Sequence, residues 1–136
     1  MARPRDDGMR QTRMVIVVED HPATQSALAD VLTEQGWEVA LAFDGETAIR
    51  LAREVHPAVV WLDLNLPTIS GFDVCEQIRA DPMLNDVSIV MTSARHSLDV
   101  RANSLEAGAD AYLPKPYDVD ELMRVVEHVC RSRNAP

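Results

Sequence analysis

The feature that most constrains the fold is a series of short apolar runs, each of which stops at polar residues. The runs have the length and composition of fully buried strands: Met14–Val18, Ala58–Leu62, Val87–Met91 and Ala111–Leu113. The polar residues that follow them are, in the same order, Glu19 with Asp20, Asp63, Thr92 with Ser93, and Lys115. In an open parallel sheet, ligands bind outside the carboxyl ends of the strands. We therefore expect three carboxylates, two hydroxyls and an ammonium group to share one crevice.

Amphipathic segments separate the apolar runs and predict helices between the strands. The segments with helical spacing are Ala23–Gln35, Gly45–Glu54, Gly71–Ala80, Leu98–Ala107 and the stretch that begins at Asp118. With a further strand at Trp37–Ala42, five strands alternate with five helices. This alternation predicts an α/β fold with right-handed crossovers and helices on both faces of a parallel sheet. We expect the doubly wound, flavodoxin-like strand order 2-1-3-4-5.

The length and the ends of the chain predict one domain with short tails. The 136 residues are enough to bury a single core. Residues 1–12 combine dense charge with Pro4 and Gly8, which predicts a flexible tail, and residues 13–131 form the predicted domain. Residues 132–136 are expected to be a C-terminal tail or the start of a linker.

Composition narrows the compartment and the partners. The net charge of −9 argues against direct binding to nucleic acid and favours a basic protein partner. No stretch has the apolar length of a signal peptide or a membrane span. Cys75 and Cys130 are too few and too far apart for a disulfide framework or a metal cluster, so we expect two reduced thiols. These features predict a cytoplasmic protein that does not contact membranes.

The predicted strand order makes the first and third strands neighbours, so that Glu19, Asp20 and Asp63 would lie close together. Their mutual repulsion is on the order of several kcal/mol at an effective dielectric constant of about 20. Either the pKa values rise or a cation binds. The candidate ligands are oxygens, which favours Mg²⁺ over zinc. His21 precedes Pro22 and is expected to shape the turn rather than to bind metal.

Asp63 is the strongest candidate for covalent chemistry. A carboxylate beside Mg²⁺ can attack phosphorus and form an acyl phosphate. The metal and Lys115 would neutralise charge on the phosphoryl oxygens, and the Ser93 hydroxyl would donate a hydrogen bond to a third oxygen. A single Asp at a strand end is often only a turn residue, but the combination of these groups predicts phosphoryl chemistry.

Several motifs give the chain a specific resemblance. They are the acidic pair Glu19 and Asp20, Asp63-Leu64-Asn65-Leu66-Pro67 with Gly71 after it, Ser93-Ala94, and Ala107-Gly108-Ala109-Asp110 leading to Lys115-Pro116. Asp63 and Ser93 are thirty positions apart, and Ser93 and Lys115 are twenty-two positions apart. Over residues 13–130 the chain resembles a response-regulator receiver domain of bacterial two-component signalling, of the chemotaxis-regulator kind.

The resemblance implies a phosphoacceptor and a set of metal ligands. Asp63 would accept the phosphoryl group. Asp20 and Asp63 would bind Mg²⁺ directly, with the backbone carbonyl of Asn65 as a further ligand. Glu19 would act through water, and it is one methylene longer than the Asp that is more usual at its position.

The resemblance also implies a switch. Lys115 would pair with the phosphoryl group, and its bond to Pro116 is expected to be cis. Ser93 would be the hydroxyl that moves toward the phosphoryl group, and Tyr112 the aromatic residue that turns inward when it does. Thr92 is of the residue type that is commoner at the switch position. The spacing selects Ser93, and Thr92 is then expected to point into the core.

The predicted function is a phosphorylation-dependent signalling switch that takes its phosphoryl group from a sensor histidine kinase or a histidine phosphotransfer protein. It would not be an enzyme beyond Mg²⁺-dependent self-phosphorylation and slow loss of the phosphoryl group. One alternative is an aspartyl-phosphate phosphatase resembling the haloacid dehalogenases, but the second Asp of that family would stand where this chain has Asn65. A flavin mononucleotide carrier is disfavoured because Glu19 and Asp20 would repel the phosphate. A pseudo-receiver that only binds partners is disfavoured because Asp20, Asp63, Ser93 and Lys115 are all present.

The expected partner downstream is either a separate protein target or a fused output domain. The residues leave open whether the protein is a single-domain regulator or part of a longer one. Phosphorylation would add about two negative charges and shift an existing equilibrium. The surfaces expected to change, and to form a phosphorylation-dependent homodimer, are Leu98–Ala107, Ala111–Leu113 and Asp118–Cys130.

Overall fold

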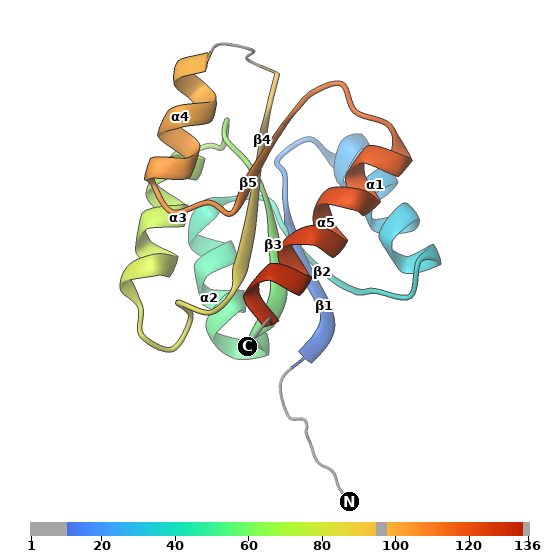
Figure 1. Ribbon diagram of the computed structural model, residues 1–136, viewed down its shortest axis with the longest axis horizontal. Helices are drawn as coiled ribbons and strands as arrows, with labels where there is room; N and C mark the ends of the chain where they lie inside the picture. The colour runs from blue at the N-terminus through green and yellow to red at the C-terminus, as the bar shows by residue number, and fades with distance from the viewer. Residues whose placement is uncertain (1–10, 95–97, 135–136) are drawn as a thin grey trace, which may run out of the picture.

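The computed structural model describes residues 11–94 and 98–134, in which strands and helices alternate along the chain (Figure 1). The strands are β1 Gln11–Val18, β2 Glu38–Ala42, β3 Pro57–Asp63, β4 Ser88–Ser93 and β5 Ala111–Pro114. The helices are α1 Pro22–Glu34, α2 Gly45–Val55, α3 Gly71–Ala80, α4 Leu98–Glu106 and α5 Val119–Asn134. The predicted α/β alternation is confirmed over this part of the chain.

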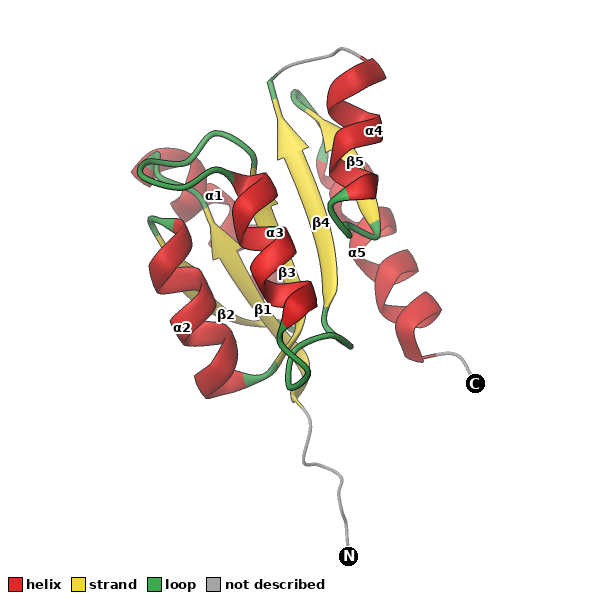
Figure 2. Ribbon diagram, turned by 90° about the vertical axis from the view of Figure 1, so that its left-hand side faces the viewer, coloured by secondary structure: helices red, strands yellow, loops and turns green. Residues whose placement is uncertain are grey.

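The five strands form one parallel sheet in the order β2-β1-β3-β4-β5, as predicted. Helices α2, α3 and α4 cover one face, and α1 and α5 cover the other (Figures 1 and 2). Because successive residues of a strand point to opposite faces, β3 supplies both layers. Leu62 packs with the α2–α4 layer, and Trp61 packs with the α1–α5 layer. The central strands are buried on both sides, which explains their nearly continuous apolar sequence.

Strand β1 and helix α5 extend beyond the limits predicted for the domain. Strand β1 begins at Gln11, which pairs with Pro57 of β3, and the register shifts between Gln11 and Val15. Helix α5 continues to Asn134, so residues 132–134 are helical rather than a tail. Polar residues at the end of a strand or helix carry no hydrophobic periodicity, so the sequence does not mark where the element ends. The predicted tail at residues 1–10 and the last two residues lie outside the described part of the chain.

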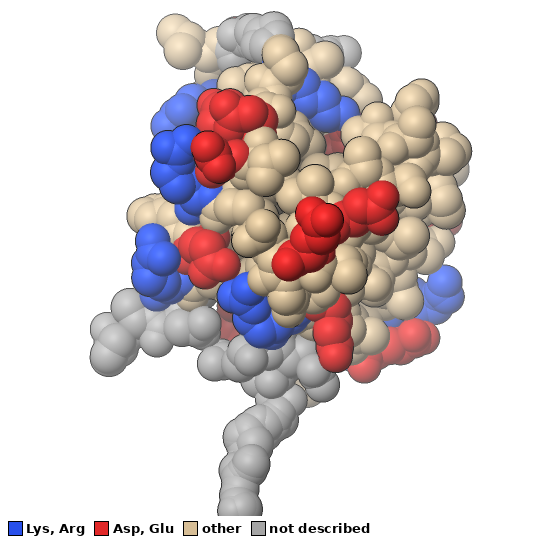
Figure 3. Space-filling model, turned by 90° about the vertical axis from the view of Figure 1, so that its right-hand side faces the viewer, with Lys and Arg blue, Asp and Glu red and all other residues tan. Residues whose placement is uncertain are grey.

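The surface around α1 and α5 is mixed in charge. On this side of the molecule, the described basic side chains lie among acidic ones and are separated by uncharged surface (Figure 3). No described helix combines the length and the apolar character that crossing a bilayer requires.

Helix α2 begins at a capping residue that can be tested directly. Asp44 has extended backbone geometry, and its Oδ1 accepts a hydrogen bond from the Thr47 backbone N–H at 2.8 Å. That hydrogen bond is the largest cause that lowers the pKa of Asp44, and a hydrogen bond with the Thr47 side chain is the next largest. A lowered folded-state pKa means that the stabilisation is complete above the ordinary pKa of Asp and is lost as the pH falls through the folded-state value.

We expect Asp44→Ala to lower the free energy of unfolding at neutral pH by about 1 kcal/mol. The difference from the wild type should shrink on acidification, because protonated Asp44 loses the charge that strengthens the cap. Urea unfolding at neutral and acidic pH measures both effects. Asp44→Asn keeps an accepting oxygen and should remain close to the wild type. Equal stability of the wild type and Asp44→Ala at neutral pH would contradict the capping role.

Candidate functional site

The candidate site lies at the carboxyl edge of the sheet, where β1 and β3 are neighbours. Asp63 is the last residue of β3, and Glu19 directly follows β1. Lys115 follows β5, two strands away from β3 in the sheet. Because all strands are parallel, these residues reach the same edge. The polar groups predicted to meet there therefore come from strands far apart in sequence.

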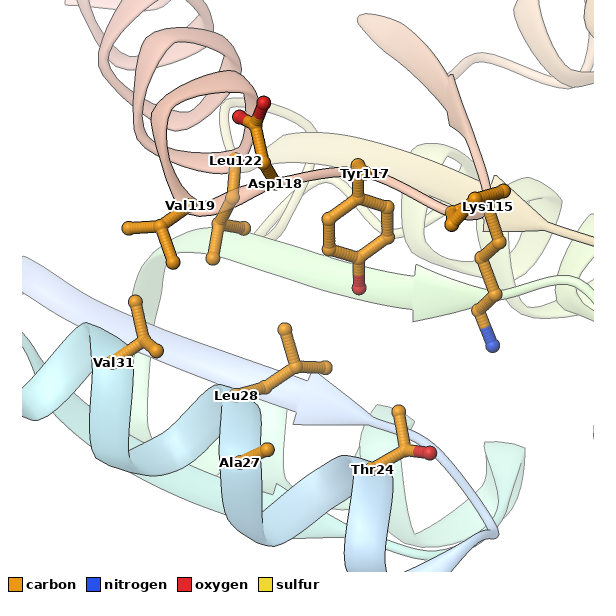
Figure 4. A pocket seen from close by; sticks show the side chains of 10 residues that line it. Thr24, Ala27, Leu28, Val31, Lys115, Tyr117, Asp118, Val119 and Leu122 are labelled. Carbon is orange, nitrogen blue, oxygen red and sulfur yellow. The ribbon is translucent and has the colours of Figure 1, made fainter.

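Lys115 joins the two buried acids. Its Nζ lies 2.8 Å from Asp63 Oδ2 and 3.2 Å from Glu19 Oε1. The side chain reaches from the loop after β5 toward the ends of β1 and β3 (Figure 4). The side chains of Glu19 and Asp63 are only 4% and 6% exposed, so water contributes little to their solvation. The ammonium group is thus the main compensation for two buried negative charges.

Backbone N–H groups orient both acids. Asp63 Oδ1 accepts from the Asn65 N–H at 2.8 Å, and Glu19 Oε2 accepts from the His21 N–H at 3.0 Å. Each carboxylate therefore has one oxygen on the backbone and one on Lys115. This arrangement holds the reactive oxygens of the site at fixed positions.

The pKa values reflect the crowding of charge. Burial is the largest cause that raises the pKa of Glu19 above its usual range, and the neighbouring Asp63 side chain is the next largest. Burial alone would lower the pKa of Lys115, but the hydrogen bond to Asp63 and the charges of Asp63 and Glu19 outweigh it, so the pKa is raised. Lys115 therefore stays charged at neutral pH. When both acids are ionised, the two carboxylates and the ammonium group carry a net negative charge, which favours binding of a further cation.

The expected cluster of three carboxylates is formed only in part. Asp20 is exposed, and in the described residues no group of three or more Asp, Glu, His or Cys side chains is arranged to hold a metal. Lys115, which the resemblance places beside the phosphoryl group, contacts Asp63 and Glu19, and its role toward a phosphoryl group stays a prediction. The donors still fit Mg²⁺ chemically, because they are all oxygens. An exposed side chain such as Asp20 changes rotamer readily.

Ser93 and Thr92 end β4 with different surroundings, and both are fully buried. Thr92 pairs with Asp63 across the sheet, and its Oγ1 has no hydrogen-bond partner in the described part of the chain. Tyr112 pairs with Met91, two residues before Ser93, and is half-buried against the α2–α4 layer. Burial raises the pKa of Tyr112, and a hydrogen bond with Ser93 opposes that rise. The two predicted switch residues are therefore in contact.

The loop after β5 shapes the other side of the site. The Lys115–Pro116 bond is cis, as expected, and the Lys115 N–H donates to Ser93 O at 2.9 Å. Tyr117 then meets Trp61 edge to face, with ring centroids 5.4 Å apart. An apolar groove of about 370 Å³ runs between α1 and the start of α5, with Lys115 at one end (Figure 4).

Two features of the site escape sequence reasoning. Trp61 looks like an ordinary strand residue, although it carries the contact with Tyr117. Gln25 lies on the buried face of α1 and donates to the backbone of Glu19. A polar residue within an otherwise apolar helical face is the signal that could have identified Gln25.

Comparison with known proteins identifies a family with which most of the chain matches. Residues 15–127 match the response regulator receiver domain. The transcriptional regulatory protein PrrA of Mycobacterium leprae is 42% identical over 130 residues, which cover 96% of this chain and 54% of that protein. The chain therefore spans about half the length of the curated relatives it matches.

Solved structures resemble the whole fold. A putative response regulator from Chloroflexus aurantiacus superimposes with a TM-score of 0.83 at 30% identity, covering 87% of this chain and 97% of that one. The receiver domain of the sensor histidine kinase PA1611 from Pseudomonas aeruginosa has a TM-score of 0.81, 30% identity and the same coverage. That structure has a magnesium ion coordinated in its active site cleft.

Gly71 tests how closely the backbone must pack beneath Asp63. Its N–H donates to Leu64 O at 2.9 Å, and a Cβ at this position would lie 2.7 Å from Asp63 O and 2.8 Å from Leu64 Cα. Backbone atoms cannot move aside as a side chain can. We expect Gly71→Ala to lower the free energy of unfolding by about 1–3 kcal/mol. We also expect it to shift the amide NMR signals of Leu64 and Asn65.

Gly36→Ala is the matched control. Gly36 has φ +93, and the nearest atom to an added Cβ is Arg13 Nη2 at 3.8 Å. This variant should lose about 1 kcal/mol through backbone strain without shifting the Asn65 signal. Unchanged stability of Gly71→Ala would show that the loop has room beneath Asp63.

Proposed function

The chain belongs to the response regulator receiver domain family, and we propose that Asp63 accepts its phosphoryl group. Members of this family are phosphorylation-dependent signalling switches rather than enzymes in the usual sense. The observation that carries the assignment is the Lys115 ammonium, which lies 2.8 Å from Asp63 at the edge where β1 and β3 meet. The donor would be a phosphohistidine of a sensor kinase or of a phosphotransfer protein.

The proposed step is a displacement at phosphorus. One carboxylate oxygen of Asp63 bonds to phosphorus while the bond between phosphorus and the donor's imidazole nitrogen breaks. The imidazole keeps the electron pair and takes a proton from water. Lys115 then turns from the carboxylate to the new phosphoryl oxygens. The Asn65 N–H, 2.8 Å from Asp63 Oδ1, keeps the carboxylate in position for attack.

We propose that Mg²⁺ is required for this step. Asp20 and Asp63 would hold it directly, together with the backbone carbonyl of Asn65, and Glu19 would act through water. When bound, the cation offsets the negative charge of the phosphoryl oxygens. The all-oxygen donor set supports this choice, as does the magnesium ion in the receiver domain of PA1611.

The acyl phosphate is proposed to persist rather than to turn over rapidly. The side chain of Asn65 cannot take a proton from water, so the general base of an aspartyl-phosphate phosphatase is missing at that position. Slow hydrolysis suits a signal that must last until a partner reads it. The contact between Asp63 and Lys115 speaks against a pseudo-receiver, because it holds the acceptor ready for a phosphoryl group.

We propose that the output is an interaction surface formed by α4, β5 and α5. It comprises Leu98–Ala107, Ala111–Leu113 and Asp118–Cys130. Strand β5 is at the sheet edge, and Leu98 and Leu105 of α4 are 84% and 42% exposed. Exposed apolar side chains beside an open strand edge favour association with a second copy or with a protein target.

The wider setting is also a proposal. The relative PrrA is a transcriptional regulatory protein about twice as long as this chain, which favours a fused output domain. The net charge of −9 supports the expectation that the receiver itself does not bind nucleic acid. We propose a cytoplasmic location, where a phosphohistidine donor would be available.

Asp63→Asn should abolish labelling by acetyl phosphate in the presence of Mg²⁺, because an amide oxygen is a poor nucleophile toward phosphorus. Phosphate-affinity electrophoresis or intact-protein mass spectrometry measures the label. Asp73→Asn, which changes an exposed acid in the first turn of α3, should be labelled like the wild type. Labelling of Asp63→Asn at another residue would overturn the assignment of the acceptor. A chelator should stop labelling without unfolding the protein, and loss of the fold would make the metal structural.

Ser93→Ala should leave labelling largely intact but weaken dimerisation or partner binding after phosphorylation, because it removes the hydroxyl that contacts Tyr112. Size-exclusion chromatography of phosphorylated and unphosphorylated protein measures this difference. Thr92→Val is the matched control, since it removes only a buried hydroxyl that has no hydrogen-bond partner among the described residues and keeps the shape of the side chain. If Thr92→Val loses the response and Ser93→Ala keeps it, Thr92 is the switch residue.

A further inference from the structure

Gln25 is a buried polar side chain that the proposed phosphoryl chemistry does not use. It is 2% exposed and shares the buried face of α1 with Leu28 and Leu32. Packing alone would accept an apolar side chain there, as it does at the two leucines. A buried amide is tolerated only where its hydrogen bonds are made. The reason for Gln25 must therefore lie in what it binds.

The amide group of Gln25 binds the ends of two neighbouring strands. Its Nε2 donates to Ala42 O, at the end of β2, at 2.9 Å and to Glu19 O, just after β1, at 3.2 Å. A third carbonyl, Val17 O, lies 3.5 Å away. The two hydrogens of an amide group serve two acceptors well, so Ala42 and Glu19 are the principal partners.

These contacts close a small ring of hydrogen bonds around Glu19. The Glu19 N–H donates to Ala42 O at 3.0 Å, so the same carbonyl accepts from Glu19 and from Gln25. The N–H of Glu19 and its C=O are thus both tied, directly or through Gln25, to the end of β2. The backbone of Glu19 has little freedom to tilt.

The consequence reaches the next residue. The Glu19 carbonyl belongs to the peptide that joins Glu19 to Asp20, and this unit is planar. Holding its oxygen sets the direction in which the chain enters Asp20. The His21 N–H, 3.0 Å from Glu19 Oε2, then orients the Glu19 side chain. The buried amide of Gln25 therefore holds the backbone from which both acidic side chains extend.

We infer that Gln25 is a positioning residue for divalent cation binding at the acidic pair. Its amide contacts backbone carbonyls rather than the side chains that would hold the cation. It holds the backbone from which Glu19 and Asp20 reach the site. This inference rests on the proposed function, since it assigns Gln25 to the metal site of that proposal.

The test is a Mg²⁺ titration of the full 136-residue chain without any phosphodonor. Gln25→Met has nearly the same length and no donor. We expect its Mg²⁺ affinity to fall about tenfold, the lower end of what loss of a supporting hydrogen bond costs at metal sites. The readout is the change in amide NMR signals of residues around Glu19 and Asn65. An affinity equal to that of the wild type would overturn the inference.

A matched control separates positioning from stability. Ser88 is 1% exposed at the start of β4, and its Oγ donates to Val129 O at 3.0 Å. Ser88→Ala removes a buried hydrogen bond at the amino end of β4, whereas the site lies at the carboxyl ends of the strands. The variant should therefore lower stability and leave Mg²⁺ affinity unchanged. If Ser88→Ala weakens Mg²⁺ binding as much as Gln25→Met does, the effect is general destabilisation and the inference is wrong.

A second variant covers the case in which Gln25→Met does not fold. Gln25→Asn keeps the donor on a side chain one methylene shorter, so it should lose reach and affinity. Retained affinity in this variant would also overturn the inference. If the wild type shows no saturable response to Mg²⁺, the metal requirement of the proposed function fails as well. Normal binding by the wild type with unchanged binding by the variants overturns the inference alone.

Discussion

The interaction on which the site depends is the pairing of one ammonium group with two buried carboxylates. Glu19 and Asp63 lie at adjoining strand ends, and two unit charges about 4 Å apart repel by about 4 kcal/mol at an effective dielectric constant of 20. Lys115 offsets that repulsion at 2.8 Å and 3.2 Å. Lys115 reaches both acids because the loop after β5 passes the end of β4, where the backbone N–H of Lys115 donates to Ser93 O.

The site is connected to both layers of helices, and the connections differ in kind. Toward α1, the neutral amide of Gln25 holds the backbone of Glu19 through hydrogen bonds to two backbone carbonyls. Toward α4, Ser93 meets Tyr112, which packs against the α2–α4 layer. An amide whose N–H groups are held by two backbone carbonyls favours rigidity, whereas a half-buried aromatic ring has more freedom to move. The fold thus separates a side that holds the acids from a side suited to a conformational response.

Much of the fold could be predicted from the sequence, and the exceptions have physical causes. Runs such as Ala58–Leu62 are recognisable because a strand buried on both faces must be apolar throughout. Gln11 and Asn134 belong to β1 and α5 but lie outside the domain predicted from the sequence, because polar residues at element ends carry no periodic signal. The contact between Asp63 and Glu19 followed from strand order, but the position of Lys115 between them did not. A long flexible side chain can reach several partners, and only the folded site selects among them.

By itself the sequence determined the layered α/β fold and the edge at which the polar groups gather, because hydrophobic periodicity and parallel strands leave few alternatives. It also determined which groups are available there, namely carboxylates, hydroxyls and an amine. Tertiary structure alone decided which of them touch. Asp20 is exposed while Glu19 is buried, and Gln25 faces two carbonyls rather than water. Such choices depend on distances between strands that are remote in sequence, and no local pattern records those distances.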